Sequence, residues 1–278
     1  MKADAELLAQ RALWAGQHAL PLFFVLLALL LVATCAGWWT LRRTTVPRRQ
    51  STISPTLVLG LHTAVGFAIM LVGIAVFAAL AGQLGAGEEL GRADQALTDA
   101  LRVSVPRPAL QVFVALTHLA DTATLTGLCI VMAIALVALG RCWLALGWVV
   151  ALAGNGLLNQ TLKQIFGRVR PLDPDGIVLA HGFSFPSGHS SGAVVAYGML
   201  AYLALRLLPA RWHLSTLLAA AVIAFTVGAS RLFLRVHFAS DVIAGFASGA
   251  AWLALCVTSI ELIRWCQQRT AMKASRWP

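Results

Sequence analysis

Residues 230–241 read Ser-Arg-Leu-Phe-Leu-Arg-Val-His-Phe-Ala-Ser-Asp, and they close a long apolar run with charged and polar side chains. Arg231 carries a permanent charge on a planar fork of donors, which suits a phosphate or a carboxylate. Asp241 follows His237 by four residues, a spacing that places both on one face of a helix. A carboxylate in that position orients an imidazole and stabilises its cation, so His237 is a candidate nucleophile.

The same pair would also fit a histidine satisfied by a helix-capping aspartate, and two upstream stretches decide between these interpretations. Residues 163–171, Lys-Gln-Ile-Phe-Gly-Arg-Val-Arg-Pro, supply Lys163 and Arg170 and end in a helix-breaking proline. Residues 186–189, Pro-Ser-Gly-His, add a hydroxyl, an unhindered backbone amide and a second histidine. In-line displacement at a tetrahedral oxyanion needs this combination of cations, donors, nucleophile and acid.

In this order the three stretches resemble the signature motifs of the type-2 phosphatidic acid phosphatase and vanadium haloperoxidase superfamily: Lys-x6-Arg-Pro, Pro-Ser-Gly-His and Ser-Arg-x5-His-x3-Asp. All three match without a gap or substitution, and the resemblance covers roughly residues 57–264. It implies that His237 attacks phosphorus to form a phosphohistidine, that Asp241 orients it, and that His189 protonates the leaving oxygen. The implied phosphoryl-binding residues are Lys163, Arg170, Ser187, Gly188 and Arg231.

Composition assigns the chain to the membrane. It is 59% hydrophobic and only 12% charged, with a mean hydropathy of +0.79, far from the range of water-soluble proteins. The formal charge of +10 does not indicate nucleic acid, because the basic residues lie between apolar runs, as in cytoplasmic loops of membrane proteins. The five cysteines form no CxxC pair and are expected to be small core residues, not a disulfide framework or a zinc site.

We therefore expect an all-α fold, a polytopic transmembrane bundle with a six-helix phosphatase core and one extra helix before it. The expected spans are residues 20–39, 57–81, 110–140, 142–162, 190–208, 214–234 and 242–264. Three regions follow from them. Residues 1–54 hold an interfacial segment, the extra helix and a basic loop, residues 55–265 the core, and residues 266–278 a basic tail.

The extra helix has two competing interpretations. Residues 20–39 could be a secretory signal peptide, and Val32 to Cys35 is faintly similar to a lipoprotein cleavage box. We favour a retained helix because residues 1–19 are neutral and four arginines between 42 and 49 would otherwise have to cross the membrane. A re-entrant or surface segment is the other arrangement left open.

Several polar residues outside the motifs have no decided role. Thr117, His118 and Asp121 interrupt the run 110–140, and we favour a helix N-cap over a direct site role for Asp121. Asn155 and Asn159 precede Lys163 at four-residue intervals, and packing amides are the favoured interpretation.

Two connecting segments are also open. Residues 82–107 have leucines near helical spacing and are expected to form an amphipathic surface helix or a plain connector. Residues 172–185 are expected to form a loop, either a lip that selects substrate or a set of solvated turn residues.

Counting the spans puts all three motifs on one face of the membrane. The opposite face collects the arginines of 42–49, Arg141, Arg206, Arg211 and the basic tail, so it should be cytoplasmic. The expected site then faces the periplasm or exterior, from the cytoplasmic (inner) membrane of a bacterium. A phosphate held there by a membrane protein is most simply that of a lipid.

The expected function is hydrolysis of a membrane lipid phosphate, with phosphatidate, phosphatidylglycerophosphate, undecaprenyl pyrophosphate and lipid A as the candidate classes. No metal or other cofactor is expected, because lysine and arginine supply the positive charge. The alternatives are a lipid phosphotransferase on the same scaffold, a vanadate-dependent haloperoxidase, and a non-enzymatic transporter or scaffold, which would leave the ordered motifs unexplained.

Overall fold

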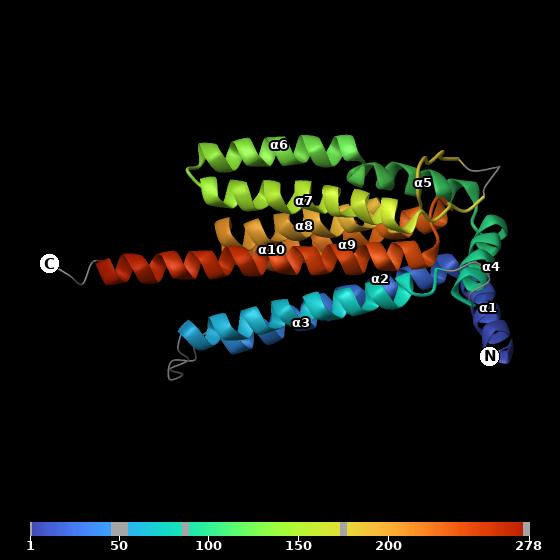
Figure 1. The fold of residues 1–278 in the computed structure, drawn as a ribbon, viewed down its shortest axis with the longest axis horizontal. Helices are drawn as coiled ribbons and strands as arrows, with labels where there is room; N and C mark the ends of the chain where they lie inside the picture. The colour runs from blue at the N-terminus through green and yellow to red at the C-terminus, as the bar shows by residue number, and fades with distance from the viewer. Residues whose placement is uncertain (1, 46–54, 85–88, 173–176, 275–278) are drawn as a thin grey trace.

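The computed structural model describes residues 2–45, 55–84, 89–172 and 177–274, and these form ten α-helices and two turns of 3-10 helix (Figure 1). The α-helices are α1 (Lys2–Gln17), α2 (Ala19–Thr45), α3 (Pro55–Ala81), α4 (Glu89–Ser104), α5 (Arg107–Thr117), α6 (Thr122–Ala138), α7 (Cys142–Phe166), α8 (Gly188–Leu207), α9 (His213–Phe233) and α10 (Ala239–Ala274). The turns η1 (His118–Ala120) and η2 (Ala210–Trp212) join α5 to α6 and α8 to α9. The expected all-α membrane bundle is confirmed.

Six helices, α2, α3, α7, α8, α9 and α10, are long and apolar enough to cross a membrane. The pair α5 and α6 makes a seventh if it is counted as one span, and it is bent by 42° at its break. This bend lies at residues 118–121, where polar residues interrupt the apolar run 110–140. The run 110–140, expected as one span, therefore contains two helices joined by a 3-10 turn.

The centre of the bundle is packed closely around α8. Trp148 of α7 is fully buried among side chains of α6, α8 and α10. Gly245 and Gly249 of α10 lie directly against α8, because a Cβ on either would come within 3 Å of backbone atoms of Ser187 or Ser191. These small residues bring the start of α8 against the start of α10.

The N-terminal segment is part of the bundle. Helix α2 packs along α9, and Phe23 stacks on Phe225 and meets Phe113 and Phe233 edge to edge, with ring centroids 5.5–5.9 Å apart. Helix α1 packs against α4, where a Cβ on Gly16 would overlap that of Ala100. The expected interfacial helix within residues 1–19 and the surface helix within residues 82–107 therefore form one pair.

Figure 1 shows that this pair lies across one end of the bundle, together with the loop between α7 and α8, and that the C-terminus lies at the other end. The tail expected at 266–278 begins as helix, since α10 continues through Ala274. Some sequence predictions fall on residues outside the described ones, namely those for Arg48, Arg49, Asp173, Asp175 and Arg276.

Candidate active site

A cavity of about 840 Å³ lies between η1 and helices α6, α7, α8 and α9 at the end of the bundle that carries α4. Six of the eight residues predicted to form the site line it: Lys163, Arg170, Gly188, His189, Arg231 and His237. The other two, Ser187 and Asp241, are fully buried behind the wall. The three motifs, which span almost eighty residues of sequence, therefore meet in one place.

His237 is oriented from both ring nitrogens. Its Nδ1 lies 3.4 Å from Asp241 Oδ2 and 3.3 Å from the Ser184 hydroxyl, which itself donates to that carboxylate at 2.5 Å. Its Nε2 lies 3.1 Å from an Arg170 guanidinium nitrogen. Because a guanidinium only donates hydrogen bonds, Nε2 carries the lone pair and Nδ1 the proton. The lone pair is on the nitrogen that faces the cavity.

The same surroundings keep His237 neutral. Burial lowers the pKa of His237 to about 3, and the nearby Arg170 and Arg231 guanidinium groups act in the same direction. The hydrogen bond with Asp241 opposes this shift by favouring the imidazolium. A neutral imidazole is the nucleophilic form, so the free base is present across the physiological pH range.

Lys163 and Arg170 donate to backbone carbonyl oxygens in the loop between α7 and α8 and in the loop between α9 and α10. Lys163 Nζ donates to the carbonyl oxygens of Phe183 and Ser184. Arg170 donates to the carbonyls of residues 181, 182 and 236 at 2.6–3.2 Å. Neither side chain has a carboxylate partner among the described residues, so their charge is available to an anion in the cavity.

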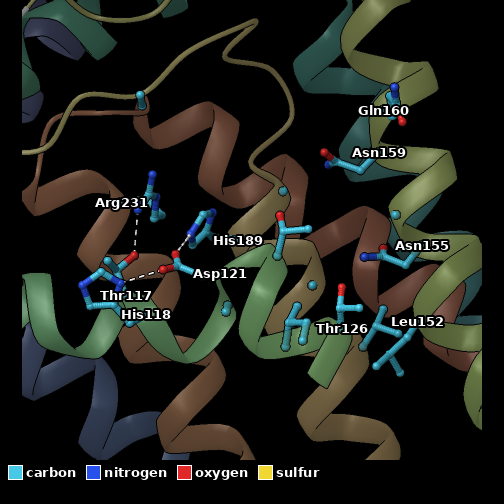
Figure 2. Close-up of a pocket in the computed structure, with 18 of the residues that line it drawn as sticks. Thr117, His118, Asp121, Thr126, Leu152, Asn155, Asn159, Gln160, His189 and Arg231 are labelled. Atoms are coloured by element: carbon cyan, nitrogen blue, oxygen red, sulfur yellow. Dashed lines mark hydrogen bonds and ion pairs between the residues drawn. The ribbon is translucent and has the colours of Figure 1, made fainter. Parts of the chain in front are cut away.

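Arg231 supports the same conclusion. One of its terminal nitrogens donates to the Thr117 hydroxyl at 2.7 Å (Figure 2), while its buried Nε has no hydrogen-bond partner among the described residues. A buried donor without a partner is costly. An oxyanion beside the three cations would satisfy it.

The Pro-Ser-Gly-His stretch forms the N-terminus of α8. Ser187 caps the helix by accepting from the Ser190 amide and hydroxyl, and its own amide donates to the Asp241 carbonyl at 3.0 Å. Gly188 faces the cavity, and a Cβ there would come 2.8 Å from Asn159 Oδ1. The Ser187 hydroxyl is thus engaged in capping, and its contact with phosphate stays a prediction, whereas Gly188 leaves a helix N-terminus open to an anion.

Two residues that the sequence analysis did not assign to the site support Asp241: Arg168 binds Asp241 directly, and Asp94 binds Arg168. Arg168 donates to Asp241 Oδ1 at 2.6 Å and to Asp94 of α4 at 2.8 Å. Asp94 is 3% exposed and also accepts from the amide and hydroxyl of Ser240. A signal for it was present, because Asp94 falls in the same helical stripe as Leu90, Leu97 and Leu101, where a carboxylate needs a partner.

The favoured capping role of Asp121 is wrong. Asp121 stands at the N-cap position of α6, but its side chain makes no capping hydrogen bond. Its carboxylate instead joins two histidines, with Oδ1 2.8 Å from His189 Nε2 and Oδ2 2.6 Å from His118 Nδ1, as Figure 2 shows. The bend between α5 and α6 thus brings a carboxylate to the second histidine of the site.

Asn155 and Asn159 of α7 both lie in the cavity wall, and Asn159 also contacts the start of α8. Asn159 donates to the Ser191 hydroxyl at 3.4 Å and packs on Gly188, which agrees with a packing amide. Both Asn155 and Asn159 line the cavity on the α7 side, opposite Asp121 (Figure 2). Among the described residues, no group of three His, Cys, Asp or Glu side chains is arranged to hold a metal ion.

The chain is similar to known membrane phosphatases. A family model described as the PAP2 superfamily matches residues 143–265. Phosphatidylglycerophosphatase B of Bacillus subtilis (strain 168) is 36% identical over 160 residues, which are 56% of this chain and 78% of that protein. The crystal structure of a transmembrane PAP2-type phosphatidylglycerolphosphate phosphatase from Bacillus subtilis superposes with a TM-score of 0.64 and 30% identity, covering 69% of this chain and 97% of that one.

The helical bundle and these relatives define a membrane-embedded phosphatase, a phosphoric monoester hydrolase. The chain belongs to the PAP2 superfamily, as the three ordered motifs predicted.

The buried pair behind Asp241 leads to a first prediction. Arg168→Gln should lower kcat far more than it raises KM, because Arg168 does not line the cavity but orients Asp241. It should also destabilise the protein by about 3 kcal/mol, since two buried carboxylates lose their cation. Arg206→Gln, which breaks an ion pair with Glu261 away from the cavity, is the matched control. Adding Asp94→Asn to Arg168→Gln should recover part of the lost stability. If the two substitutions destabilise the protein additively, the coupling between Asp94 and Arg168 is contradicted.

The lowered pKa of His237 gives a second prediction. Between about pH 6.5 and pH 3 the unfolded chain binds a proton on this residue that the folded protein does not, so stability falls as the pH falls. Thermal unfolding midpoints in detergent, measured from pH 7 to pH 4.5, should drop more steeply for the wild type than for His237→Gln. Equal slopes would show that the folded protein protonates His237 normally.

Proposed function

We propose that this protein removes the terminal phosphate from a glycerophospholipid of the phosphatidylglycerophosphate type through a phosphohistidine on His237. The observation that carries the proposal is the unprotonated nitrogen of His237, Nε2, which faces the cavity and lies 3.1 Å from an Arg170 guanidinium nitrogen. Arg231 and Lys163 line the same cavity. A nucleophile beside clustered cations is the arrangement that phosphoryl transfer requires.

In the first step, His237 Nε2 attacks phosphorus and the bond to the lipid oxygen breaks. Lys163, Arg170 and Arg231 neutralise the charge on the equatorial oxygens, and the Gly188 amide at the start of α8 adds a donor. His189 protonates the departing oxygen. In the second step water attacks phosphorus, gives its proton to His189, and the electron pair of the P–N bond returns to Nε2.

The shape of the cavity supports a lipid substrate. Its polar end holds the cations and histidines, and its lining continues between α6, α7 and α8 with Leu125, Ile130, Leu152 and Val195. A phosphate with an attached hydrocarbon chain matches this change from polar to apolar walls. The phosphatidylglycerophosphatase relatives support the glycerophospholipid class over the polyprenyl and lipid A alternatives.

Orientation and location are part of the proposal. The arginines near the ends of α2 and α8, away from the cavity, together with Arg141 between α6 and α7, favour a cytoplasmic location for that end. The site would then face the periplasm or exterior from the inner membrane. Helix α1 lies at the site end, which supports seven spans with the N-terminus on the catalytic side. The core at 55–265 would carry the chemistry.

A substrate panel tests the function. Purified protein in detergent should release phosphate from phosphatidylglycerophosphate faster than from phosphatidate or undecaprenyl pyrophosphate. His237→Ala should abolish both phosphate release and the covalent phosphoenzyme, because it removes the ring nitrogen that lies beside Arg170 in the cavity.

Three outcomes would contradict parts of this proposal. Full activity in His237→Ala would exclude the phosphohistidine. A preference for undecaprenyl pyrophosphate would exclude the glycerophospholipid class. Transfer of the phosphoryl group to an added acceptor lipid in place of water would make the protein a phosphotransferase.

Topology gives the next prediction. In a variant without native cysteines, Ala5→Cys should react with a membrane-impermeant thiol reagent in cells with a permeabilised outer layer, whereas Ser275→Cys should react only after lysis. The reason is that α1 lies at the site end and α10 carries the chain to the other end. If neither cysteine reacts before lysis, α2 does not cross the membrane.

A further inference from the structure

We propose that Asp121 is a positioning residue that makes a single nitrogen of His189, Nδ1, serve both proton transfers of the reaction. The inference rests on the proposed function, in which His189 first donates and then accepts a proton. It starts from the carboxylate that joins His118 and His189 at the bend between α5 and α6 (Figure 2).

The first step of the argument is the assignment of the ring nitrogens. His189 Nε2 lies 2.8 Å from Asp121 Oδ1, and an ionised carboxylate only accepts hydrogen bonds. Nε2 therefore carries a proton. Nδ1 makes no hydrogen bond to another described residue, and the ring lines the cavity, so Nδ1 is the nitrogen available to substrate.

The second step concerns charge. His189 must be a cation to protonate the leaving oxygen, yet two other cations, Arg231 and Arg170, line the same cavity. Asp121 is the carboxylate in contact with the ring and offsets these two guanidinium groups. After Nδ1 gives its proton to the lipid oxygen, Nε2–H stays bonded to Asp121. The lone pair left on Nδ1 then accepts a proton from the attacking water, which restores the imidazolium.

The third step is the position of Asp121 in the fold. Asp121 lies between η1 and the start of α6. One turn earlier, the Thr117 hydroxyl at the end of α5 accepts a hydrogen bond of 2.7 Å from Arg231. The bend therefore supports a phosphate-binding cation and the acid at the same time. The His118 side chain, which is 64% exposed, contacts the second carboxylate oxygen of Asp121 and so fixes this carboxylate from the solvent side.

The test compares substrates with different leaving groups in Asp121→Asn. Turnover of the lipid phosphate should fall roughly 100-fold, because its alkoxide needs an acid. With p-nitrophenyl phosphate, whose phenolate leaves without a proton, formation of the phosphoenzyme should stay near the wild-type rate. Hydrolysis of the phosphoenzyme should slow. One equivalent of nitrophenolate should therefore appear as a burst while an acid-labile phosphoenzyme accumulates.

Two further variants complete the design. Glu261→Gln removes a carboxylate from another ion pair, with Arg206, and should show neither the burst nor the loss. Asp121→Glu keeps the charge and should recover at least tenfold of the lipid activity. Vanadate binding shows whether Asp121→Asn is folded. If it is not folded, Asp121→Glu provides the test. The proposal then requires that Asp121→Glu slows turnover of the lipid phosphate more than it slows the burst with p-nitrophenyl phosphate.

Equal losses with both substrates and no accumulated phosphoenzyme would overturn the role of Asp121, as would an Asp121→Asn protein that behaves like the wild type. The proposed function fails in a different way, through a wild-type protein that forms no phosphoenzyme or a His237→Ala protein that keeps its activity.

Discussion

The structure depends on one buried negative charge, the carboxylate of Asp241. This group is inaccessible to solvent, and such burial is tolerable only where its oxygens are satisfied by hydrogen bonds and opposite charge. Arg168 takes one oxygen, and the Ser184 hydroxyl and the Phe238 amide take the other, next to His237. These contacts bring α4, the loop after α7 and the start of α10 together around Asp241.

The cations that line the cavity, in contrast, have few negatively charged partners. Lys163 and Arg170 are held by loop carbonyls, which neutralise little of their charge, and Arg231 Nε has no hydrogen-bond partner among the described residues. The folded protein thus presents positive charge to a cavity whose remaining walls become apolar. The proposed lipid phosphate would match this arrangement with its anionic group and its hydrocarbon chain.

The two histidines show how one residue type acquires two roles. His237 is fully enclosed and meets Asp241 through Nδ1, which leaves Nε2 toward the cavity. His189 is partly exposed and meets Asp121 through Nε2, which leaves Nδ1. The carboxylates bind opposite ring nitrogens because α10 and the α5–α6 bend approach the cavity from different directions. In the proposed mechanism, this difference in environment separates the nucleophile from the proton carrier.

The sequence by itself determined the membrane class, the helical spans and the ordered motifs, because hydropathy and short spacings are local properties. It placed Asp241 one turn after His237 for the same reason. Only the tertiary structure decided the long-range partners, since the contact of Asp94 with Arg168 joins segments 74 residues apart and that of Asp121 with His189 joins segments 68 apart. Asp121 occupied a typical capping position in the sequence, and its real partner depended on a bend whose geometry no local pattern encodes. The packing of α1 against α4 was likewise decided by tertiary contacts, because two amphipathic segments separated by two spans carry no sign of pairing.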